Sequence, residues 1–279
     1  MSSFASYDGT ELGYHVRGGG LPLVCLPGGP GRAAEYLGDL GGLSESRQLV
    51  LLDPRGVGSS ADPADPATFR VDRLVSDVES LRIHLGLDRM DLLAHSAGAF
   101  LATLYAAAHP QRLSRLILVT PGLAAVGTQG TEEEFLAALD RRAAEPWYPE
   151  ARAALEKIMA GDLSVEAFRA SRPFFYGRWD ETARAHATMG VSERNQAARE
   201  GYFAGLDLDP PATRAALKKL TAPVLLYAGT LDPMVTPAMA RAAAPVFNDA
   251  AVAVQPGASH FPWVDDPAAF AAAAGPFLG

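Results

Sequence analysis

This 279-residue chain has a single cysteine, no long apolar run and no excess of basic residues. The one cysteine, Cys25, excludes an internal disulfide, and its place in an apolar run indicates a core residue rather than a catalytic thiol. Acidic residues outnumber basic ones by 32 to 24, so no electrostatic attraction to nucleic acid or to an anionic membrane is expected. No window reaches the roughly 18 apolar residues of a membrane span, and the N-terminus has no signal-peptide pattern. These absences indicate a cytoplasmic protein without nucleic-acid or membrane partners, and they leave the oligomeric state open.

Short apolar runs bounded by turn residues stand near both ends of the sequence. Residues 21–26 and 48–52 have the continuous apolar character of strands buried on both faces, as in parallel sheets. Residues 10–17 alternate weakly, which suits an edge strand. The spacing of leucine and valine predicts a helix at 71–85. Further strands are predicted at 90–94, 113–119, 222–229 and 250–255, and further helices at 97–109, 237–246 and 267–278.

The order of these elements predicts an α/β fold with a mostly parallel, doubly wound sheet. Buried strand runs stop near residue 123 and resume near residue 220, and amphipathic helices rich in aromatic residues fill the interval. We therefore predict a core domain made of residues 1–122 and 220–279, with a helical cap subdomain inserted at 123–219. Ligands of such sheets bind beyond the carboxyl ends of the strands, where the loops converge.

The stretch 91–100, D-L-L-A-H-S-A-G-A-F, has the outline of a nucleophile elbow. A strand that turns into a helix within a few residues strains the central residue, here Ser96, and needs small residues two positions away on each side. Ala94 and Gly98 meet that need. The alternative is a serine that only caps a helix after a buried strand. The rest of the chain has to decide between these two interpretations.

Candidate partners for the serine follow the last two predicted strands. A serine hydroxyl needs a base to take its proton, and the base needs an acid to orient it. Asp232 comes three residues after the strand at 222–229, and His260 lies in the loop after the last strand. This is the chain order serine, acid, histidine of α/β-hydrolases. The other histidines lack this place and order, and His95 is only the variable residue of the elbow. We predict Ser96 as nucleophile, His260 as base and Asp232 as orienting acid.

The glycine-rich loop P-G-G-P-G at 27–31 is the candidate oxyanion loop. Glycine lets the backbone approach a substrate closely, and two N–H donors are needed to stabilise the developing negative charge. We predict the N–H groups of Gly29 and Ala97 as these donors, with Gly28 as a possible donor from the same loop. A tight turn without a catalytic role is the alternative.

These motifs resemble those of the α/β-hydrolases, and within them those of the proline iminopeptidase group. That group has H-G-G-P-G in its oxyanion loop and D-x-R-G-x-G-x-S after the following strand. This chain has P-G-G-P-G at 27–31 and D-P-R-G-V-G-S-S at 53–60. The resemblance to the superfamily spans nearly the whole core, and the resemblance to the subgroup rests on these two loops. We interpret Asp53 and Arg55 as an internal ion pair that ties the second loop together.

The chain departs from the iminopeptidase pattern around the nucleophile. Pro27 replaces the histidine that opens the oxyanion loop, and Ala94 replaces a glycine. Ala97 stands where iminopeptidases typically have tryptophan. These departures bear on the substrate more than on the mechanism.

The cap is where the resemblance implies a site for the substrate's free amine. Iminopeptidases bind that amine with cap glutamates, one of them in a stretch like E-N-H-Y-F, whereas this chain has R-E-G-Y-F at 199–203. Glu200 lies one position away from the place of the iminopeptidase glutamate, so we favour a solvent-facing role for it. Asp180 is a second cap carboxylate that could bind an amine. For the cap aromatics, packing in a small core of the cap's own is the alternative to binding. The candidate substrate-binding residues are Trp179, Glu200, Tyr202 and Phe203.

Together these residues predict a serine hydrolase that forms an acyl-enzyme intermediate and acts on a small molecule or a short peptide. The resemblance favours proline iminopeptidase-like hydrolysis of a small amide or peptide. The alternatives are an esterase, lactonase or thioesterase, a biosynthetic enzyme that catalyses a non-hydrolytic rearrangement, and a fold that only binds a ligand. The sequence has no metal-ligand spacing and no dinucleotide fingerprint, so we expect no cofactor.

Overall fold

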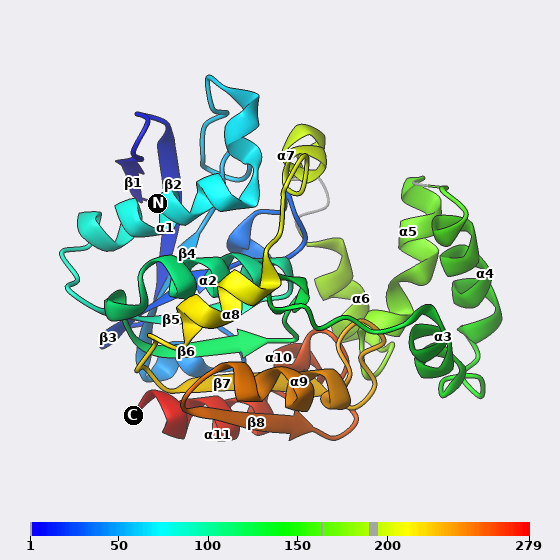
Figure 1. The fold of residues 1–279 in the computed structure, drawn as a ribbon. Helices are drawn as coiled ribbons and strands as arrows, with labels where there is room; N and C mark the ends of the chain where they lie inside the picture. The colour runs from blue at the N-terminus through cyan, green and yellow to red at the C-terminus, as the bar shows by residue number, and fades with distance from the viewer. Residues whose placement is uncertain (1, 163, 190–194) are drawn as a thin grey trace.

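The computed structural model describes residues 2–162, 164–189 and 195–279, and a sheet of eight strands forms its centre (Figure 1). The strands lie in the order β1-β2-β4-β3-β5-β6-β7-β8. The pairs β1–β2 and β2–β4 are antiparallel, and the other neighbouring strands are parallel. The strands are β1 (Ser2–Ala5), β2 (Glu11–Arg17), β3 (Leu21–Leu26), β4 (Arg47–Leu52), β5 (Met90–His95), β6 (Leu113–Val119), β7 (Val224–Gly229) and β8 (Ala250–Gln255). The predicted α/β fold with a mostly parallel sheet is confirmed.

Helices cover the sheet and fill the interval between β6 and β7 (Figure 1). Around the sheet lie α1 (Val71–His84), α2 (Ala97–Ala108), α8 (Pro210–Leu217), α9 (Pro237–Ala243), α10 (Pro262–Asp265) and α11 (Pro267–Leu278). The interval also holds α3 (Glu132–Asp140), α4 (Tyr148–Met159), α5 (Val165–Ser171), α6 (Glu181–Thr188) and α7 (Gln196–Gly201). The 3-10 helices used below are η1 (Ala34–Leu37), η3 (Pro66–Phe69), η5 (Ala124–Val126) and η6 (Arg172–Phe175). Within the described ranges, no helix has the length and apolar character needed to cross a bilayer. The cytoplasmic location stays a prediction.

Both faces of the sheet are buried because successive residues of each strand point to opposite sides. In β5, Leu92 and Ala94 pack in the core cluster that includes residues of α1, α2 and α8. Leu93 packs in the cluster on the other face, with residues of η1 and α11. This two-sided burial explains why the strands are continuous apolar runs.

Strand β2 is not an edge strand, so that prediction is wrong. It pairs with β1 through Leu12 and Phe4, and with β4 through Tyr14 and Leu52. The edge strand on this side of the sheet is β1, with the sequence S-S-F-A, in which only Phe4 is buried. It is a strand because its backbone pairs with β2, and its side chains have no apolar pattern from which a strand could be predicted.

Helices α3 to α5 stand beside the sheet domain, and residues of α3, α4 and η6 bury a small core there (Figure 1). Phe174 lies in that core and Trp147 packs against it, so both aromatics have the structural role that was the alternative to binding. By contrast, α8 lies within the predicted cap range but packs against α2, and its Leu217 is fully buried in the sheet domain. An amphipathic helix does not reveal in its sequence which surface it covers. The range 123–219 therefore includes a helix of the sheet layer.

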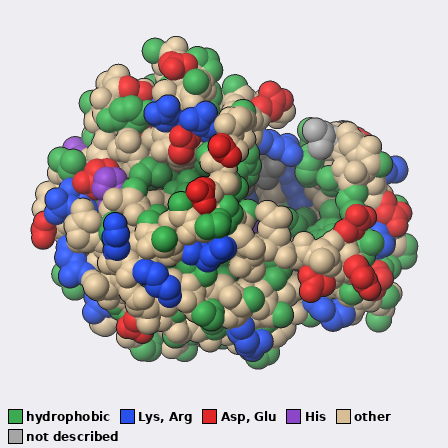
Figure 2. Space-filling view, in the orientation of Figure 1, with side chains coloured by type: hydrophobic (Ala, Val, Ile, Leu, Met, Phe, Trp, Pro, Cys, Tyr) green, Lys and Arg blue, Asp and Glu red, His purple; other side chains and the backbone are tan. Residues whose placement is uncertain are grey.

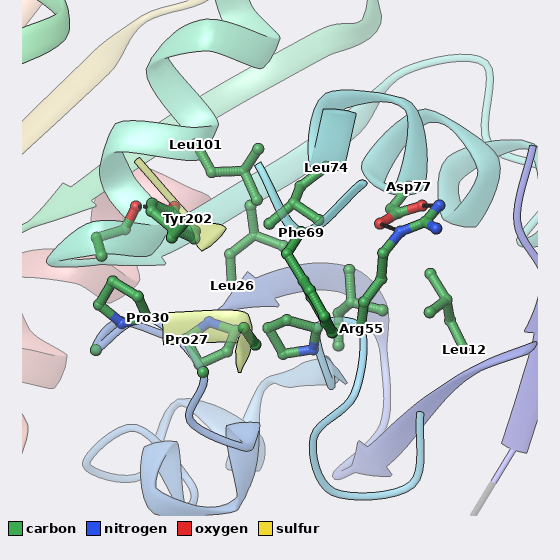
Figure 3. A pocket seen from close by; sticks show the side chains of 17 residues that line it. Leu12, Leu26, Pro27, Pro30, Arg55, Phe69, Leu74, Asp77, Leu101 and Tyr202 are labelled. Atoms are coloured by element: carbon green, nitrogen blue, oxygen red, sulfur yellow. Dashed lines mark hydrogen bonds and ion pairs between the residues drawn. The ribbon is translucent and has the colours of Figure 1, made fainter. Parts of the chain in front are cut away.

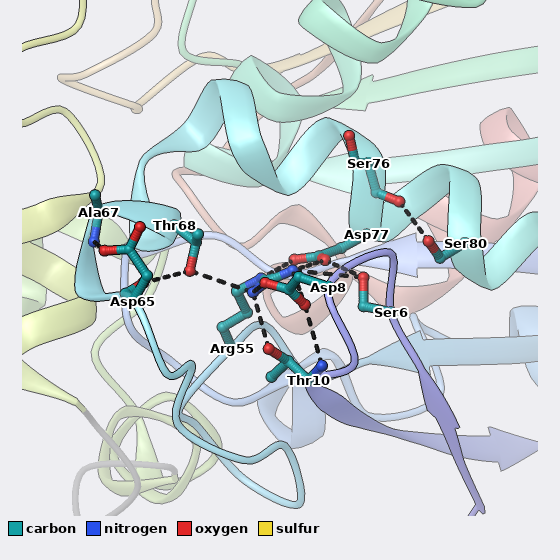
Figure 4. A network of polar contacts seen from close by, with 10 residues as sticks. All are labelled: Ser6, Asp8, Thr10, Arg55, Asp65, Ala67, Thr68, Ser76, Asp77 and Ser80. Carbon is teal, nitrogen blue, oxygen red and sulfur yellow. Dashed lines mark hydrogen bonds and ion pairs between the residues drawn. The ribbon is translucent and has the colours of Figure 1, made fainter.

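Asp53 and Arg55 are both buried, but each has partners other than the one we predicted. Arg55 Nε donates to Asp77 Oδ2 at 2.6 Å, and the same guanidinium binds Asp8 (Figure 4). Asp53 instead accepts hydrogen bonds from the backbone N–H and the hydroxyl of Ser59, both at 2.9 Å. The predicted ion pair between Asp53 and Arg55 is therefore wrong. Arg55 links its loop to α1 and to the β1–β2 turn and forms no ion pair with the described residues of the loop itself. Both residues still have a structural role.

Candidate active site

Ser96 occupies the turn from β5 into α2 with φ 53° and ψ −116°. A non-glycine residue in such a conformation costs about 1–3 kcal/mol, so the surroundings have to hold it. The Ser96 N–H donates to Val119 O at 2.9 Å, and the Ser96 carbonyl accepts from Gly122 N at 3.1 Å. A Cβ on Gly98 would lie 2.4 Å from Pro27 O, so glycine is required there. The Ser96 side chain forms no cap hydrogen bond to α2, and this removes the helix-cap interpretation.

The three side chains predicted as nucleophile, base and acid lie in one hydrogen-bonded row. Ser96 Oγ is 2.9 Å from His260 Nε2, and His260 Nδ1 is 2.9 Å from Asp232 Oδ2. Asp232 is fully buried, and its Oδ1 accepts the N–H of Met234 at 2.8 Å. Because a carboxylate accepts, the proton of neutral His260 is on Nδ1 and Nε2 is free to accept from the serine hydroxyl. The row has the polarity that proton abstraction from Ser96 requires.

The backbone of His260 is anchored from both sides. Its N–H donates to Phe175 O of η6 at 3.1 Å, and the rings of the two residues lie 5.9 Å apart. Its carbonyl accepts from Thr120 Oγ1 at 3.1 Å and faces His95 Nε2 at 2.9 Å. The predicted base is therefore held by η6 on one side and by His95 at the end of β5 on the other.

His95 links this carbonyl to the oxyanion loop. Since a carbonyl can only accept, His95 Nε2 donates to His260 O, and the neutral ring then accepts at Nδ1 from Tyr36 Oη, 2.7 Å away. Tyr36 Oη in turn accepts the N–H of Gly28. Burial, and next the charge of His260, hold the pKa of His95 well below its usual range. The chain of hydrogen bonds is therefore complete only with a neutral His95.

Neither His95 nor Tyr36 was predicted as a site residue. A usable signal existed for His95, because it ends a strand whose every position is buried, and a buried imidazole needs two partners. No pattern in the sequence marked Tyr36, since η1 meets β5 only in the folded chain.

The two predicted oxyanion donors differ from Gly28 in what they bind. The Gly29 N–H has no acceptor within the described part of the chain, and Gly29 has a positive φ of 59°. Ala97 is the first residue of α2, where an N–H has no partner within the helix. The N–H of Gly28 is already bound to Tyr36, so the structure favours Gly29 over Gly28. A Cβ on Gly28 would lie 2.7 Å from the Cβ of Ser96, which explains the glycine at this position.

A narrow apolar cavity of about 30 Å³ begins at these donors. Gly29 and Ala97 are among its lining residues, and Leu26, Phe69 and Tyr202 are among the side chains that enclose it (Figure 3). The ion pair of Arg55 with Asp77 closes the far end. The space holds about two water molecules, so an acyl group that entered it would have to be small and apolar.

Of the four cap residues predicted to bind substrate, Tyr202 approaches the elbow directly. Its hydroxyl donates to Ala97 O at 2.7 Å, and its ring lines the cavity. Phe203 is 48% exposed and packs on Phe100 with a ring distance of 5.2 Å. Trp179 packs on Tyr176 and does not line the cavity at the oxyanion loop.

The two cap carboxylates considered for amine binding have other roles. Glu200 is exposed, and its Oε1 accepts from Gln196 Nε2 at 2.6 Å. Asp180 caps helix α6 by accepting the N–H of Ala183 at 3.0 Å. Neither side chain lines the cavity at the oxyanion loop.

Comparison with known proteins identifies the family. Residues 22–267 match the model of the alpha/beta hydrolase fold family. The chain belongs to this family and is an enzyme of the serine hydrolase class.

Within the family, the chain is similar to proline iminopeptidases. The proline iminopeptidase of Heyndrickxia coagulans is 36% identical over 112 residues, which are 40% of this chain and 39% of that protein. The proline iminopeptidase of Levilactobacillus brevis is 26% identical over 267 residues, which are 90% of this chain and 86% of that protein. An esterase from Exiguobacterium antarcticum superposes with a TM-score of 0.75 at 20% identity, over 99% of this chain and 98% of that one. At such identity the esterase shows the fold alone.

Proposed function

We propose that the chain is a serine acyl hydrolase in which Ser96, His260 and Asp232 form the catalytic triad. The observation that carries this proposal is the unbroken row of 2.9 Å contacts from Ser96 Oγ through the imidazole to a fully buried carboxylate. The strained turn at Ser96 supports it, because such strain persists where a function needs the exposed hydroxyl.

The proposed reaction has two halves. Ser96 Oγ attacks the substrate carbonyl while His260 Nε2 takes the hydroxyl proton, and Asp232 stabilises the resulting imidazolium through Nδ1–H. The N–H groups of Gly29 and Ala97 stabilise the negative oxygen of the tetrahedral intermediate. His260 then returns the proton to the leaving group as the bond to it breaks. A water molecule, deprotonated by His260, attacks the acyl-enzyme and releases the acid and free Ser96.

Small-molecule carboxylic esters are the substrate class that the site supports best. The cavity beside Gly29 and Ala97 is apolar and narrow, which suits a short acyl chain. A free amine would need a carboxylate nearby, yet Glu200 faces solvent and Asp180 caps a helix.

Iminopeptidase-like hydrolysis of a small amide or peptide is the second candidate. Its support is the sequence similarity to proline iminopeptidases and the shared loops at 27–31 and 53–60. The replacement of the elbow tryptophan by Ala97 separates the chain from that group.

Fluorophosphonate labelling followed by turnover assays tests the proposal. We expect the wild type to be labelled and to hydrolyse short-chain aryl esters faster than proline or alanine arylamides. Ser96→Ala should lose both label and turnover, whereas Ser80→Ala should keep both, because Ser80 only binds a carbonyl within helix α1. Absence of label from the wild type would refute an activated serine. Faster arylamide turnover would make the iminopeptidase candidate the better one, and labelling without any turnover would favour a non-hydrolytic enzyme.

A further inference from the structure

Arg32 is a buried cation without a counter-charge beside the oxyanion loop. Five arginines are less than 9% exposed in the described part of the chain, and four of them have carboxylate partners. Those four are Arg47 with Asp91, Arg55 with Asp77, Arg82 with Glu79, and Arg142 with Glu145. Arg32, 7% exposed, has no carboxylate partner among the described residues. Burying an unpaired charge is unfavourable, so its retention points to a charge that arrives with a ligand.

The contacts of Arg32 hold its guanidinium at the site without neutralising it. Nη2 donates to Met189 O at 3.0 Å, and Nε is buried without a partner in the described ranges. The guanidinium carbon lies 3.7 Å from the centre of the Tyr36 ring and 5.9 Å from that of Phe261, the residue after His260. A Cβ on Gly29 would be 3.7 Å from both Cβ and Cδ of Arg32. Arg32 is thus packed between the oxyanion loop and the loop of the proposed base.

A second unpaired arginine comes from the cap. Arg172 begins η6, whose Phe175 binds the backbone of His260, and its half-buried side chain has no hydrogen bond or ion pair with any described residue. After burial, the positive charge of Arg172 is a further cause that lowers the pKa of Arg32. Both arginines adjoin the loop of His260: Arg32 lies near the ring of Phe261, and Arg172 begins the short helix whose Phe175 binds the backbone of His260. This local pair of cations contrasts with the net charge of −8 of the whole chain. Figure 2 shows basic side chains inside the hollow between the α7 segment and the α4–α5 pair.

We propose that Arg32 and Arg172 form an anion subsite, and that the substrate carries a carboxylate in addition to the acyl group attacked by Ser96. This inference rests on the proposed acyl hydrolysis and narrows its substrate class to acidic esters, such as half-esters of dicarboxylic acids. Neither arginine lines the apolar cavity beside Gly29 and Ala97, so the charged end of such a substrate would lie outside that cavity. The guanidinium fork matches a carboxylate well, and one from each side of the site would orient the substrate across the serine. The positive charge of such a subsite is opposite to the negative charge that binding of a free amine requires.

A pair of nitrophenyl esters tests the subsite through activity. The wild type should hydrolyse the half-ester of glutaric acid with a kcat/KM about tenfold above that of the neutral acetate ester, the equivalent of one charged contact. Arg172→Gln should lower the ratio of the two kcat/KM values about tenfold, and Arg172→Lys should keep most of it. Arg73→Gln is the matched control, because its side chain is 58% exposed on α1, and it should keep the wild-type ratio. An equal ratio in the wild type and in Arg172→Gln would overturn the proposal.

Binding measured without turnover separates this inference from the proposed function. Glutarate should bind Ser96→Ala protein in calorimetry, and the double variant with Arg172→Gln should bind it about tenfold more weakly. Binding without any ester or amide turnover would refute the proposed hydrolysis and keep the anion subsite. Turnover of neutral esters without glutarate binding would refute the subsite alone. Tighter binding of glycerol phosphate than of glutarate would overturn the assignment to a carboxylate.

Discussion

Replacement of Tyr36 by phenylalanine tests whether the hydrogen-bond chain behind the elbow positions the oxyanion loop. The change removes one oxygen and keeps the ring against Arg32 and Phe261. It leaves the N–H of Gly28 and Nδ1 of His95 without the hydroxyl that joins them.

The expected loss of stability follows from these two groups. A buried polar group that loses its partner costs about 1–3 kcal/mol. Two groups lose their partner here, so Tyr36→Phe should lower the free energy of unfolding by about 2–6 kcal/mol. The peptide that follows Gly28 carries the proposed Gly29 donor. A shift of a fraction of an ångström there should lower kcat about tenfold, because transition-state contacts depend strongly on position. KM should change little, since the donor acts on charge that develops in the transition state.

Tyr227→Phe is the matched control for this experiment. Its hydroxyl donates to Gln255 Oε1, which is also buried, on strands β7 and β8 away from Ser96. The control should lose about 1–3 kcal/mol and keep the wild-type kcat. Urea denaturation gives the free energies, and aryl ester hydrolysis gives kcat and KM. If Tyr36→Phe loses stability but, like the control, keeps the wild-type kcat, the positioning role is wrong.

Three further predictions concern the packing around the site. Burial lowers the pKa of His186 from 6.5 to about 4. The neutral, buried His186 therefore stabilises the folded protein above pH 6.5, and this stabilisation is lost as the pH falls toward 4. In urea denaturation, the stability advantage of the wild type over His186→Gln should shrink by about 3 kcal/mol over that range. Gly98→Ala should cost about 2 kcal/mol in denaturation and most of kcat, because its Cβ would lie 2.4 Å from a backbone carbonyl, and wild-type values for both would contradict this. Asp77→Asn should lower the free energy of unfolding by about 3 kcal/mol, because it removes a charged partner of the buried Arg55. A loss below about 1 kcal/mol in the same assay would show that Asp8 alone is enough to stabilise the charge of Arg55.

Much of the core could be predicted from local pattern. Strands β3, β6 and β8 and helix α11 begin and end where the apolar runs placed them. A strand buried on both faces is apolar throughout, so its limits are written in its own residues. Two features could not be predicted because a neighbouring element decides them. Strand β2 was predicted as an edge strand but is covered by β1, and helix α8 lies in the predicted cap range but packs against α2.

The sequence by itself determined the residues from which the proposed triad is drawn, because chain order and strand ends restrict Ser96, Asp232 and His260 to one edge of a parallel sheet. The tertiary structure decided what surrounds them. The link from Gly28 through Tyr36 and His95 to His260 joins segments up to about 230 residues apart. Likewise, only the folded chain shows that Arg32 is buried without a carboxylate partner among the described residues. Contacts of this kind depend on packing between distant segments, and no local spacing encodes them.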